Sequence, residues 1–247
     1  MERYRLYDGF AAFYNRYWGE YFLEDARAGV ADALLARLPP GSRVLDLCCG
    51  TGQTAAWLLA CGFEVVGVDG SEPMLRYARE NATTAEFLCA DAREFVLPQP
   101  VAGALATFDS MNHLPTLEGL RQVFERVFQA LLPGGWFLFD INTHEGFEYA
   151  ADETYAVTAA DHVGIVRSLY DAATRTGTSW ITLFEPAEGG LWARRDLEIP
   201  EYCHPTGQVV AAIEAAGFRK PRIFDATEDF GMPKAEGRLF LLTQRPT

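Results

Sequence analysis

The chain lacks the basic charge that a nucleic-acid or membrane partner would call for. Of its 247 residues, 21 are Lys or Arg and 34 are Asp or Glu, which gives a formal net charge of −13. Binding to phosphates draws on a basic face, so we expect neither a nucleic acid nor a membrane surface as partner. No apolar run reaches the roughly 18 residues of a spanning helix. The opening MERYRLYDGF also lacks the pattern of a secretory signal.

Cysteine is scarce as well, and its spacing suits no metal. The five cysteines are Cys48, Cys49, Cys61, Cys89 and Cys203. An odd count without C-x-x-C spacing argues against a disulfide framework and against a zinc site. We therefore expect reduced thiols in a cytoplasmic protein, and no metal.

What is present is an ordinary globular composition, with 49% hydrophobic and 22% charged residues. This length and composition suit one large α/β domain, or a core with an inserted cap. The sequence pattern divides the chain into four parts: residues 1–40, 41–144, 145–200 and 201–247.

The first part combines spaced aromatic residues with a helical period. Steps of three and four residues place most of them on one helical face. They are Tyr4, Tyr7, Phe10, Phe13, Tyr14, Tyr17, Trp18, Tyr21 and Phe22. An amphipathic helix is predicted to follow over 21–38, ended by Pro39-Pro40-Gly41. We interpret the part as a lid that excludes water from a ligand; the alternative is the apolar face of a core helix.

The second part alternates short apolar runs with helical stretches. Strands are predicted at 43–48, 64–69, 86–90, 102–108 and 136–141, with the longest helix at 117–132. Strict alternation means βαβ crossovers and a parallel sheet with helices on both faces. Ligands bind such a sheet beyond the carboxyl ends of its strands.

The remaining parts first leave this pattern and then return to it. Residues 145–200 hold four β-rich segments separated by turn signals, which predicts an antiparallel cap inserted after the fifth strand. A helix over 205–216 and strands at 221–225 and 238–243 are expected to rejoin the main sheet. The expected fold is α/β: doubly wound, with a mostly parallel seven-stranded sheet, an N-terminal helical lid and an inserted β cap.

The most informative stretch is VLDLCCGTGQT, residues 44–54. Gly50 and Gly52 allow a tight turn and a close approach of backbone to ligand. Asp69 ends the second predicted strand, where an acidic side chain can accept both hydroxyls of a ribose. The glycines alone also fit the dinucleotide fingerprint, which leaves an NAD-dependent dehydrogenase as an alternative.

Four further features disfavour that alternative. Asp46 lies inside the first strand, where a carboxylate suits a cationic amino group better than a pyrophosphate. Asp91 follows the third strand, where it can accept an adenine amino group. The turn Pro133-Gly134-Gly135 leads into the fifth strand, and the Tyr-x-x-x-Lys pair of a dehydrogenase is missing.

With these residues in view, the sequence resembles the class I S-adenosylmethionine (SAM)-dependent methyltransferases. VLDLCCGTGQT, VVGVDGS, LCADARE and LLPGGWFLFD look like that family's motifs, in the right order and spacing. The resemblance covers roughly 40–144, with weaker matches in AAIEAAGF and RLFLLTQ. It implies a Rossmann-like fold, SAM as cofactor and S-adenosylhomocysteine (SAH) as product, and it leaves the acceptor unnamed.

The resemblance also implies roles for the cofactor residues. Gly50 and Gly52 would pack against the methionine part of SAM, with Asp46 near its ammonium and Asp69 on the ribose. The other implied contacts are Gly70 and Met74 at the adenine, Asp91 on its amino group, the Ala92 backbone N–H on a ring nitrogen, and Phe108 and Asp109 at the methionine and methyl group. Plainer roles remain open for Asp69 as a helix cap, for Met74 as core and for Asp91 as a turn acid.

The reaction implied is in-line transfer of the methyl group to an N or O atom of a small molecule. Residues 108–115 do not match the [DN]-P-P-[YF] motif of the family's adenine and glutamine N-methyltransferases. His113 is the predicted base, with a neutral turn residue under the lid as the alternative. Tyr14, together with Tyr7, is predicted to offer a hydroxyl to SAM or acceptor. A non-catalytic SAM-binding regulatory protein also remains open.

Several residues are weaker candidates for the acceptor pocket. His204 is expected at a helix N-terminus rather than at the acceptor, and Asn142 and Thr143 are placed at the pocket edge. The cap offers candidate lining residues, of which strand alternation sends only half inward: Trp180, Phe184, Trp192, Arg194 and Arg195. Its exposed edges also permit a homodimer.

Overall fold

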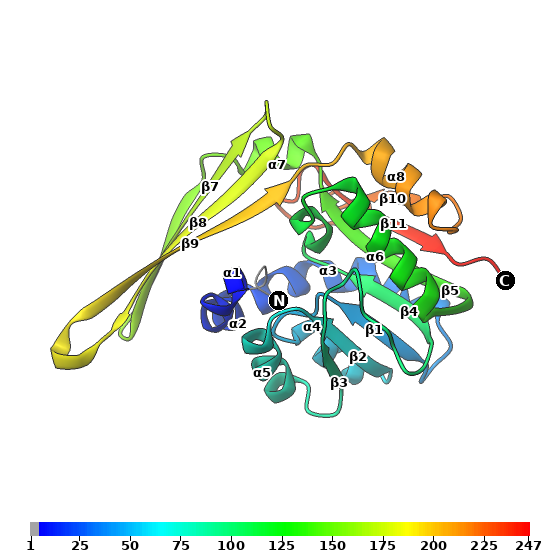
Figure 1. Cartoon of the computed structure of the whole chain (residues 1–247), viewed down its shortest axis with the longest axis horizontal. Helices are drawn as coiled ribbons and strands as arrows, with labels where there is room; N and C mark the ends of the chain where they lie inside the picture. Colours follow the sequence, from blue (N-terminus) through cyan, green and yellow to red (C-terminus); the bar gives the residue numbers. More distant parts are fainter. Residues whose placement is uncertain (1–4) are drawn as a thin grey trace.

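The computed structural model describes residues 5–247 and arranges them around two sheets (Figure 1). The larger sheet has seven strands in the order β10-β11-β5-β4-β1-β2-β3, and the smaller has four in the order β6-β7-β8-β9. β1, β2, β3, β4 and β5 pair in parallel, while β11 joins β5 and β10 antiparallel. The expected α/β fold class is confirmed.

The strands lie close to their predicted positions. Those of the large sheet are β1 (Arg43–Leu47), β2 (Glu64–Asp69), β3 (Glu86–Cys89), β4 (Val101–Ala106), β5 (Leu131–Asn142), β10 (Arg222–Asp225) and β11 (Arg238–Gln244). Those of the small sheet are β6 (Thr154–Ala159), β7 (His162–Asp171), β8 (Thr176–Pro186) and β9 (Trp192–Tyr202).

Helices cover both faces of the large sheet. They are α3 (Gly19–Ala33), α4 (Gln53–Ala60), α5 (Glu72–Asn81), α6 (Leu117–Ala130) and α8 (Thr206–Ala215), with a short 3-10 turn η2 (Leu35–Arg37) after α3. Side-chain oxygens cap two of these helices: Ser71 accepts from Met74 N, and Thr116 accepts from Gly119 N. One core cluster packs α6 and α8 against the sheet and the other packs α3 and α4, as a doubly wound fold requires.

The predicted lid is helical but broken. It forms α1 (Arg5–Asp8) and α2 (Ala11–Tyr17) before α3 begins, and Tyr4 lies outside the described residues. Phe10 and Phe13 are buried against Val166 and Ile181 of the small sheet and against Met74 of α5. In Figure 1, α1 and α2 lie between the twisted ribbon of β7, β8 and β9 and the rest of the molecule.

Two strand boundaries of the large sheet differ from prediction by more than one residue. The fourth strand ends at Ala106, so Phe108 and Asp109 lie outside it with φ of 62° and 48°. The turn η3 (Ser110–His113) follows at once. The fifth strand begins at Leu131 rather than at 136, because the Pro133-Gly134-Gly135 stretch already belongs to β5.

Two short elements of the cap were not predicted. They are α7 (His144–Ala150), which follows β5, and η4 (Glu188–Gly190), which turns the chain from β8 to β9. Across residues 5–247, no helix is long and apolar enough to cross a bilayer.

Candidate active site

A cavity of about 510 Å³ lies where the strands β1, β2 and β4 end. The motif loops line one part of it, and α1 and α2 contribute Tyr7 and Tyr14. The small sheet contributes Val166, Ser179 and Glu201. The four parts of the sequence therefore meet at one space, and its volume suits a small-molecule site.

Asp69 fastens the loops after β1 and β2. Its Oδ2 accepts from the Gly50 backbone N–H at 2.9 Å and its Oδ1 accepts from Ser71 N at 2.9 Å. The residue lines the cavity, and burial raises the pKa of its carboxyl. Each oxygen keeps a second lone pair for a ligand, so this fastening is compatible with binding ribose hydroxyls.

The two motif glycines have different surroundings. Gly50 lines the cavity with φ of 52°, and a Cβ there would lie 3.3 Å from the Tyr14 ring. Gly52 is absent from the cavity lining; its φ is 83° and a Cβ would lie 2.8 Å from Ala78 Cα. Gly52 thus lets α4 pack closely on α5, a role that the motif alone does not reveal.

Asp46 lies behind the main cavity. It is 2% exposed and lines a small cavity of about 20 Å³ that shares Tyr14, Cys48 and Phe108 with the larger one. Its Oδ2 has no hydrogen-bond partner among the described residues. Burial, and secondarily the charge of Asp69, raise its pKa to about 8. A buried carboxylate oxygen without a partner fits a cationic amino group such as that of SAM.

The adenine side is only partly as expected. Gly70, Met74 and Ala92 line the cavity, and Met74 also packs in the lid cluster, so its two predicted roles coexist. Asp91 is not among the lining residues. Its Oδ1 accepts from the backbone N of Arg93 at 2.8 Å and from Nε at 2.9 Å.

Tyr14 extends from α2 toward the motif loop. Burial and the charges of Asp109, Asp69 and Asp46 hold the pKa of its hydroxyl far above its usual range. The phenol therefore stays neutral and suits a hydrogen-bond donor, not a base. This restricts the predicted catalytic role of Tyr14 to donating a hydrogen bond from its hydroxyl.

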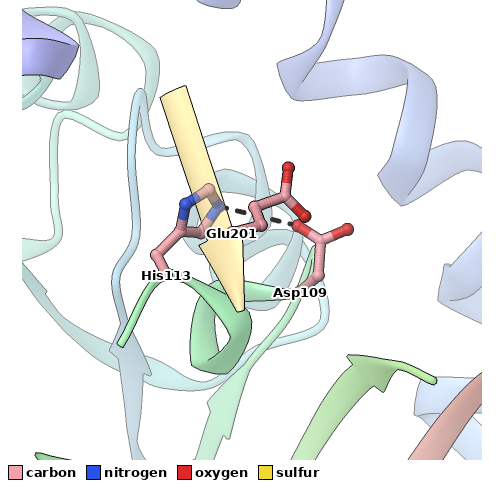
Figure 2. A group of neighbouring side chains, drawn as sticks. All are labelled: Asp109, His113 and Glu201. Atoms are coloured by element: carbon pink, nitrogen blue, oxygen red, sulfur yellow. Dashed lines mark ion pairs between the residues drawn. The ribbon is translucent and has the colours of Figure 1, made fainter. Parts of the chain in front are cut away.

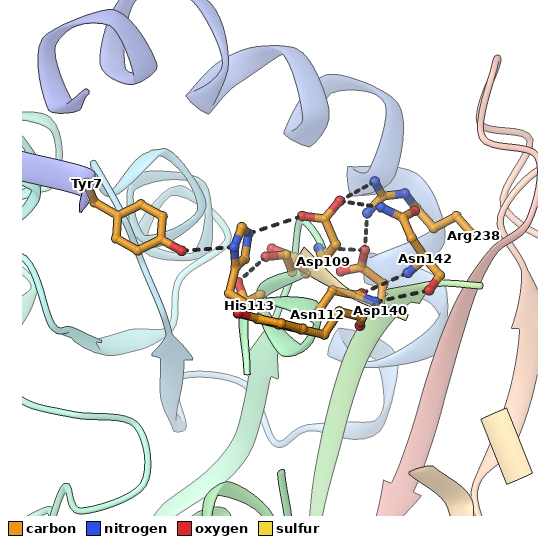
Figure 3. Close-up of polar contacts among 10 residues, drawn as sticks. Tyr7, Asp109, Asn112, His113, Asp140, Asn142 and Arg238 are labelled. Atoms are coloured by element: carbon orange, nitrogen blue, oxygen red, sulfur yellow. Dashed lines mark hydrogen bonds and ion pairs between the residues drawn. The ribbon is translucent and has the colours of Figure 1, made fainter. Parts of the chain in front are cut away.

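His113 lies in a chain of polar contacts that begins at the lid (Figure 3). The Tyr7 hydroxyl and His113 Nδ1 are 2.8 Å apart, and His113 Nε2 is 3.8 Å from Asp109 Oδ1. Burial lowers the pKa of the imidazole, and the charge of Asp109 opposes that shift. A neutral imidazole at the cavity wall is able to accept a proton.

The series of polar contacts continues from Asp109 into a buried network of ion pairs that the sequence did not predict. Arg238 Nη2 donates to Asp109 Oδ2 at 2.6 Å, and Nη1 pairs with fully buried Asp140. Asn142 Nδ2 also donates to Asp109 Oδ2, at 2.8 Å, and Asp109 N donates to Asp140 Oδ2 at 2.9 Å. These contacts hold Asp109 in its left-handed turn. The available signal was a charged residue inside each of the apolar runs WFLFDI and GRLFLL.

Glu201 is a further residue that sequence reasoning missed. It lies near the end of β9 and lines the cavity, whereas the predicted cap ended at residue 200. One ligand atom each of Asp109, His113 and Glu201 lie within 4.8 Å of one another (Figure 2). Burial, and then the charge of Asp109, raise the pKa of Glu201 to about 8.

The weaker candidates divide between the site and its support. Asn142 lines the cavity and Thr143 does not. His204 is also absent from the lining; its Nε2 lies 2.7 Å from the Leu114 carbonyl oxygen and ties the loop after η3 to the last helix. The structure thus gives His204 a supporting position away from the acceptor.

The predicted cap lining was wrong. None of the five cap residues that the sequence proposed lines the cavity: Trp180, Phe184, Trp192, Arg194 and Arg195. Trp180 and Trp192 are exposed. In β8, Gly177, Thr178 and Ser179 line the cavity instead, so the lining lies near the start of the strand.

Comparison with known proteins shows similarity to methyltransferases. Residues 44–135 match the family model of a methyltransferase domain. YqeM of Bacillus subtilis, whose name gives methyltransferase as its class without a substrate, is 28% identical over 97% of both chains. A dTDP-3-amino-3,4,6-trideoxy-alpha-D-glucopyranose N,N-dimethyltransferase of Streptomyces venezuelae is 31% identical over 43% of this chain and 45% of its own.

A solved structure is similar over nearly the whole fold. It is an S-adenosylmethionine-dependent methyltransferase from Clostridium acetobutylicum, with a TM-score of 0.74 at 18% identity over 98% of this chain and 99% of its own. The dehydrogenase alternative is thereby set aside. Residues 44–135 thus match a methyltransferase domain, and over nearly its whole length the chain is similar to proteins named as methyltransferases.

Proposed function

We propose that this enzyme transfers the methyl group of SAM to an N or O atom of a small molecule held in the 510 Å³ cavity. The observation that carries the proposal is that motif loops, lid and cap line one shared space. SAM supplies a methyl group that is already electrophilic. The protein therefore has to align the acceptor and keep water out.

The cofactor would be held by the motif residues. Asp46 would pair with the ammonium of SAM, which its unpartnered oxygen supports, and Asp69 would accept the ribose hydroxyls. The remaining contacts that we propose are Gly50 at the methionine part, Gly70, Met74 and Ala92 at the adenine, and Phe108 and Asp109 near the methyl group.

Residues 1–40 would act as a lid and 145–200 as a cap, over a cofactor core formed by 41–144 and completed by 201–247. Three hydrogen bonds support the lid: Ser71 Oγ donates to Asp8 at 2.8 Å, and Gln53 and Asn81 donate to Asn15 Oδ1 at 2.9 and 2.7 Å. They fix α1 and α2 to α4 and α5, beside the loop that would hold SAM.

His113 would serve as the base where the acceptor has a proton to lose, and the neutral Tyr14 hydroxyl would orient SAM or acceptor. The partial relative from Streptomyces venezuelae is named for a small sugar-nucleotide amine, which supports a small acceptor. The net charge of −13 disfavours nucleic acid. A homodimer through the cap and a cytoplasmic location stay predictions.

The test is an acceptor screen that detects SAH by mass spectrometry. We expect SAH above background with members of a panel of small amines, alcohols and carboxylic acids. His113→Ala should lower turnover more than SAM affinity. SAH formed only with protein, tRNA or DNA added would contradict the proposal.

A further inference from the structure

The cavity wall carries more negative than positive groups. Among the described residues that line it, Asp69, Asp109 and Glu201 are acidic, and Arg238 is the single Lys or Arg. The guanidinium of Arg238 already pairs with both Asp109 and Asp140. The guanidinium therefore leaves little positive charge to balance the Glu201 carboxylate, so the cavity wall favours a cationic ligand.

Glu201 is the least satisfied of these acids. No hydrogen bond from any residue in 5–247 reaches its carboxylate, while Asp109 accepts from both Asn142 and Arg238. Figure 2 shows the Glu201 carboxylate turned toward Asp109 and His113. The ligand atoms of the three residues lie within 4.8 Å of one another.

Two facing carboxylates in a half-buried place require a proton or a cation between them. In the protein alone that need is met by a proton, since burial and the Asp109 charge raise the pKa of Glu201 to about 8. The charged and titratable groups that face Glu201 are Asp109, His113 and Arg238, with Tyr7 behind His113. A ligand that brings its own positive charge would displace the proton.

We propose that the methyl acceptor is an amine, bound as an ammonium group between Asp109 and Glu201, an inference that rests on the proposed methyl transfer. A protonated nitrogen has no lone pair, so an N–H bond must break first. The proton passes to the neutral imidazole of His113, which lies within 4.8 Å of both carboxylates, and the electron pair stays on nitrogen. That pair then forms the new N–CH₃ bond while the S–CH₃ bond breaks toward sulfur.

An alcohol would bind more weakly than an amine between Asp109 and Glu201. It is uncharged, and it would leave the two carboxylates facing each other with one still protonated. A hydrogen bond with an ionised donor or acceptor is roughly twice as strong as a neutral one, and an ammonium group makes such bonds to both carboxylates. The Asp109–Glu201 pair thus selects by charge, and the apolar remainder of the cavity selects by shape.

The experiment measures amine binding by calorimetry with SAH present at saturation. The probes are cyclohexylamine and benzylamine, with cyclohexanol and benzyl alcohol as uncharged counterparts. We expect the amines to bind at least tenfold more tightly than the alcohols. At pH 7, buffers of different ionisation enthalpy should show release of close to one proton per amine bound.

Glu201→Gln should weaken the amines at least tenfold and abolish the proton release. Glu198→Gln is the matched control, because Glu198 is an exposed acid of the same strand that is absent from the cavity lining. It should behave as wild type. SAH affinity should be unchanged in both variants.

Three results would overturn the proposal. The first is equal binding of amines and alcohols, including binding of neither. The second is tight Mn²⁺ binding that Glu201→Gln removes and the amines do not compete for, which would assign the place to a metal. The third is a fall in affinity of Glu201→Gln for SAM but not SAH, which would assign Glu201 to the sulfonium. Failure of wild type to bind SAM or SAH would instead contradict the methyltransferase function itself.

Discussion

The two ends of the cavity are built in different ways. At the cofactor end, Asp69 joins two loops within 19 residues of sequence through backbone N–H groups. At the acceptor end, contacts span long stretches: Tyr7 meets His113 across 106 residues, and Arg238 meets Asp109 across 129. The cofactor end is fixed by local loops, and the acceptor end by a charged network drawn from the lid, core and cap.

Because the two ends of the cavity are built differently, one end can change in sequence while the other stays the same. The contacts of Asp69 are made to backbone N–H groups and lie wholly within the matched domain of 44–135. The acceptor end depends on lid and cap residues outside the matched domain of 44–135. A change of acceptor is therefore possible without disturbing the loops that we propose bind SAM.

The largest expected effect breaks the acceptor end. Arg238→Met leaves Asp109 and fully buried Asp140 without their cation. Removing one partner of a buried ion pair costs about 3–5 kcal/mol. We expect a loss of that order in the free energy of unfolding, measured by urea denaturation. Exposed Arg219→Met is the control. Equal midpoints for the two variants would show that the network adds no stability.

The next largest effect is expected from a substitution that disturbs helix packing at the cofactor end. Gly52→Ala forces a Cβ against Ala78 of α5, whereas Gly62 has nearly the same φ, 87°, with nothing within 4 Å of a Cβ. Positive φ alone costs about 1 kcal/mol for Ala. Gly52→Ala should cost at least about 1 kcal/mol more than Gly62→Ala, because overpacking adds to it. Equal losses of stability in urea would remove the helix-packing role.

A smaller effect sharpens the comparison at the ligand. Asp69→Asn should weaken SAM and SAH alike by at least tenfold, because the amide's NH₂ group cannot accept a hydrogen bond. Glu72→Gln, which alters an exposed acid of the same helix start, serves as control. Calorimetric titration reports both ligands. Wild-type affinity in Asp69→Asn would refute the ribose assignment.

The last effect concerns the pH dependence of stability. The folded pKa of Asp46 is about 8 against an ordinary 3.8, so the folded state holds the proton more tightly. Stability without cofactor therefore falls as pH rises from about 4 to about 8, and Glu201 adds a loss of the same sign. Asp46→Asn should lose less stability between pH 5 and 8 than wild type in thermal melts. Asp32→Asn, which changes an exposed acid, should lose as much stability as wild type over this pH range. If the stability of Asp46→Asn depended on pH as steeply as that of wild type, the raised pKa of Asp46 would be contradicted.

The same division explains what the sequence predicted. The seven-stranded sheet, Asp69 and Gly50 were predictable because short strands, turns and motif glycines are local patterns. Glu201 and Arg238 were not, since their importance arises from folding β9 and β11 next to the turn after β4. The cap lining failed for a related reason: the strands were identified, but their inward face depends on register.

The most direct test is the SAH dissociation constant of Glu201→Gln, measured beside those of wild type and Asp69→Asn. If the two ends are separate, Glu201→Gln binds SAH as wild type does, while Asp69→Asn binds it at least tenfold more weakly. A loss in Glu201→Gln as large as that in Asp69→Asn would contradict the account, because the acid on β9 would then belong to the cofactor site.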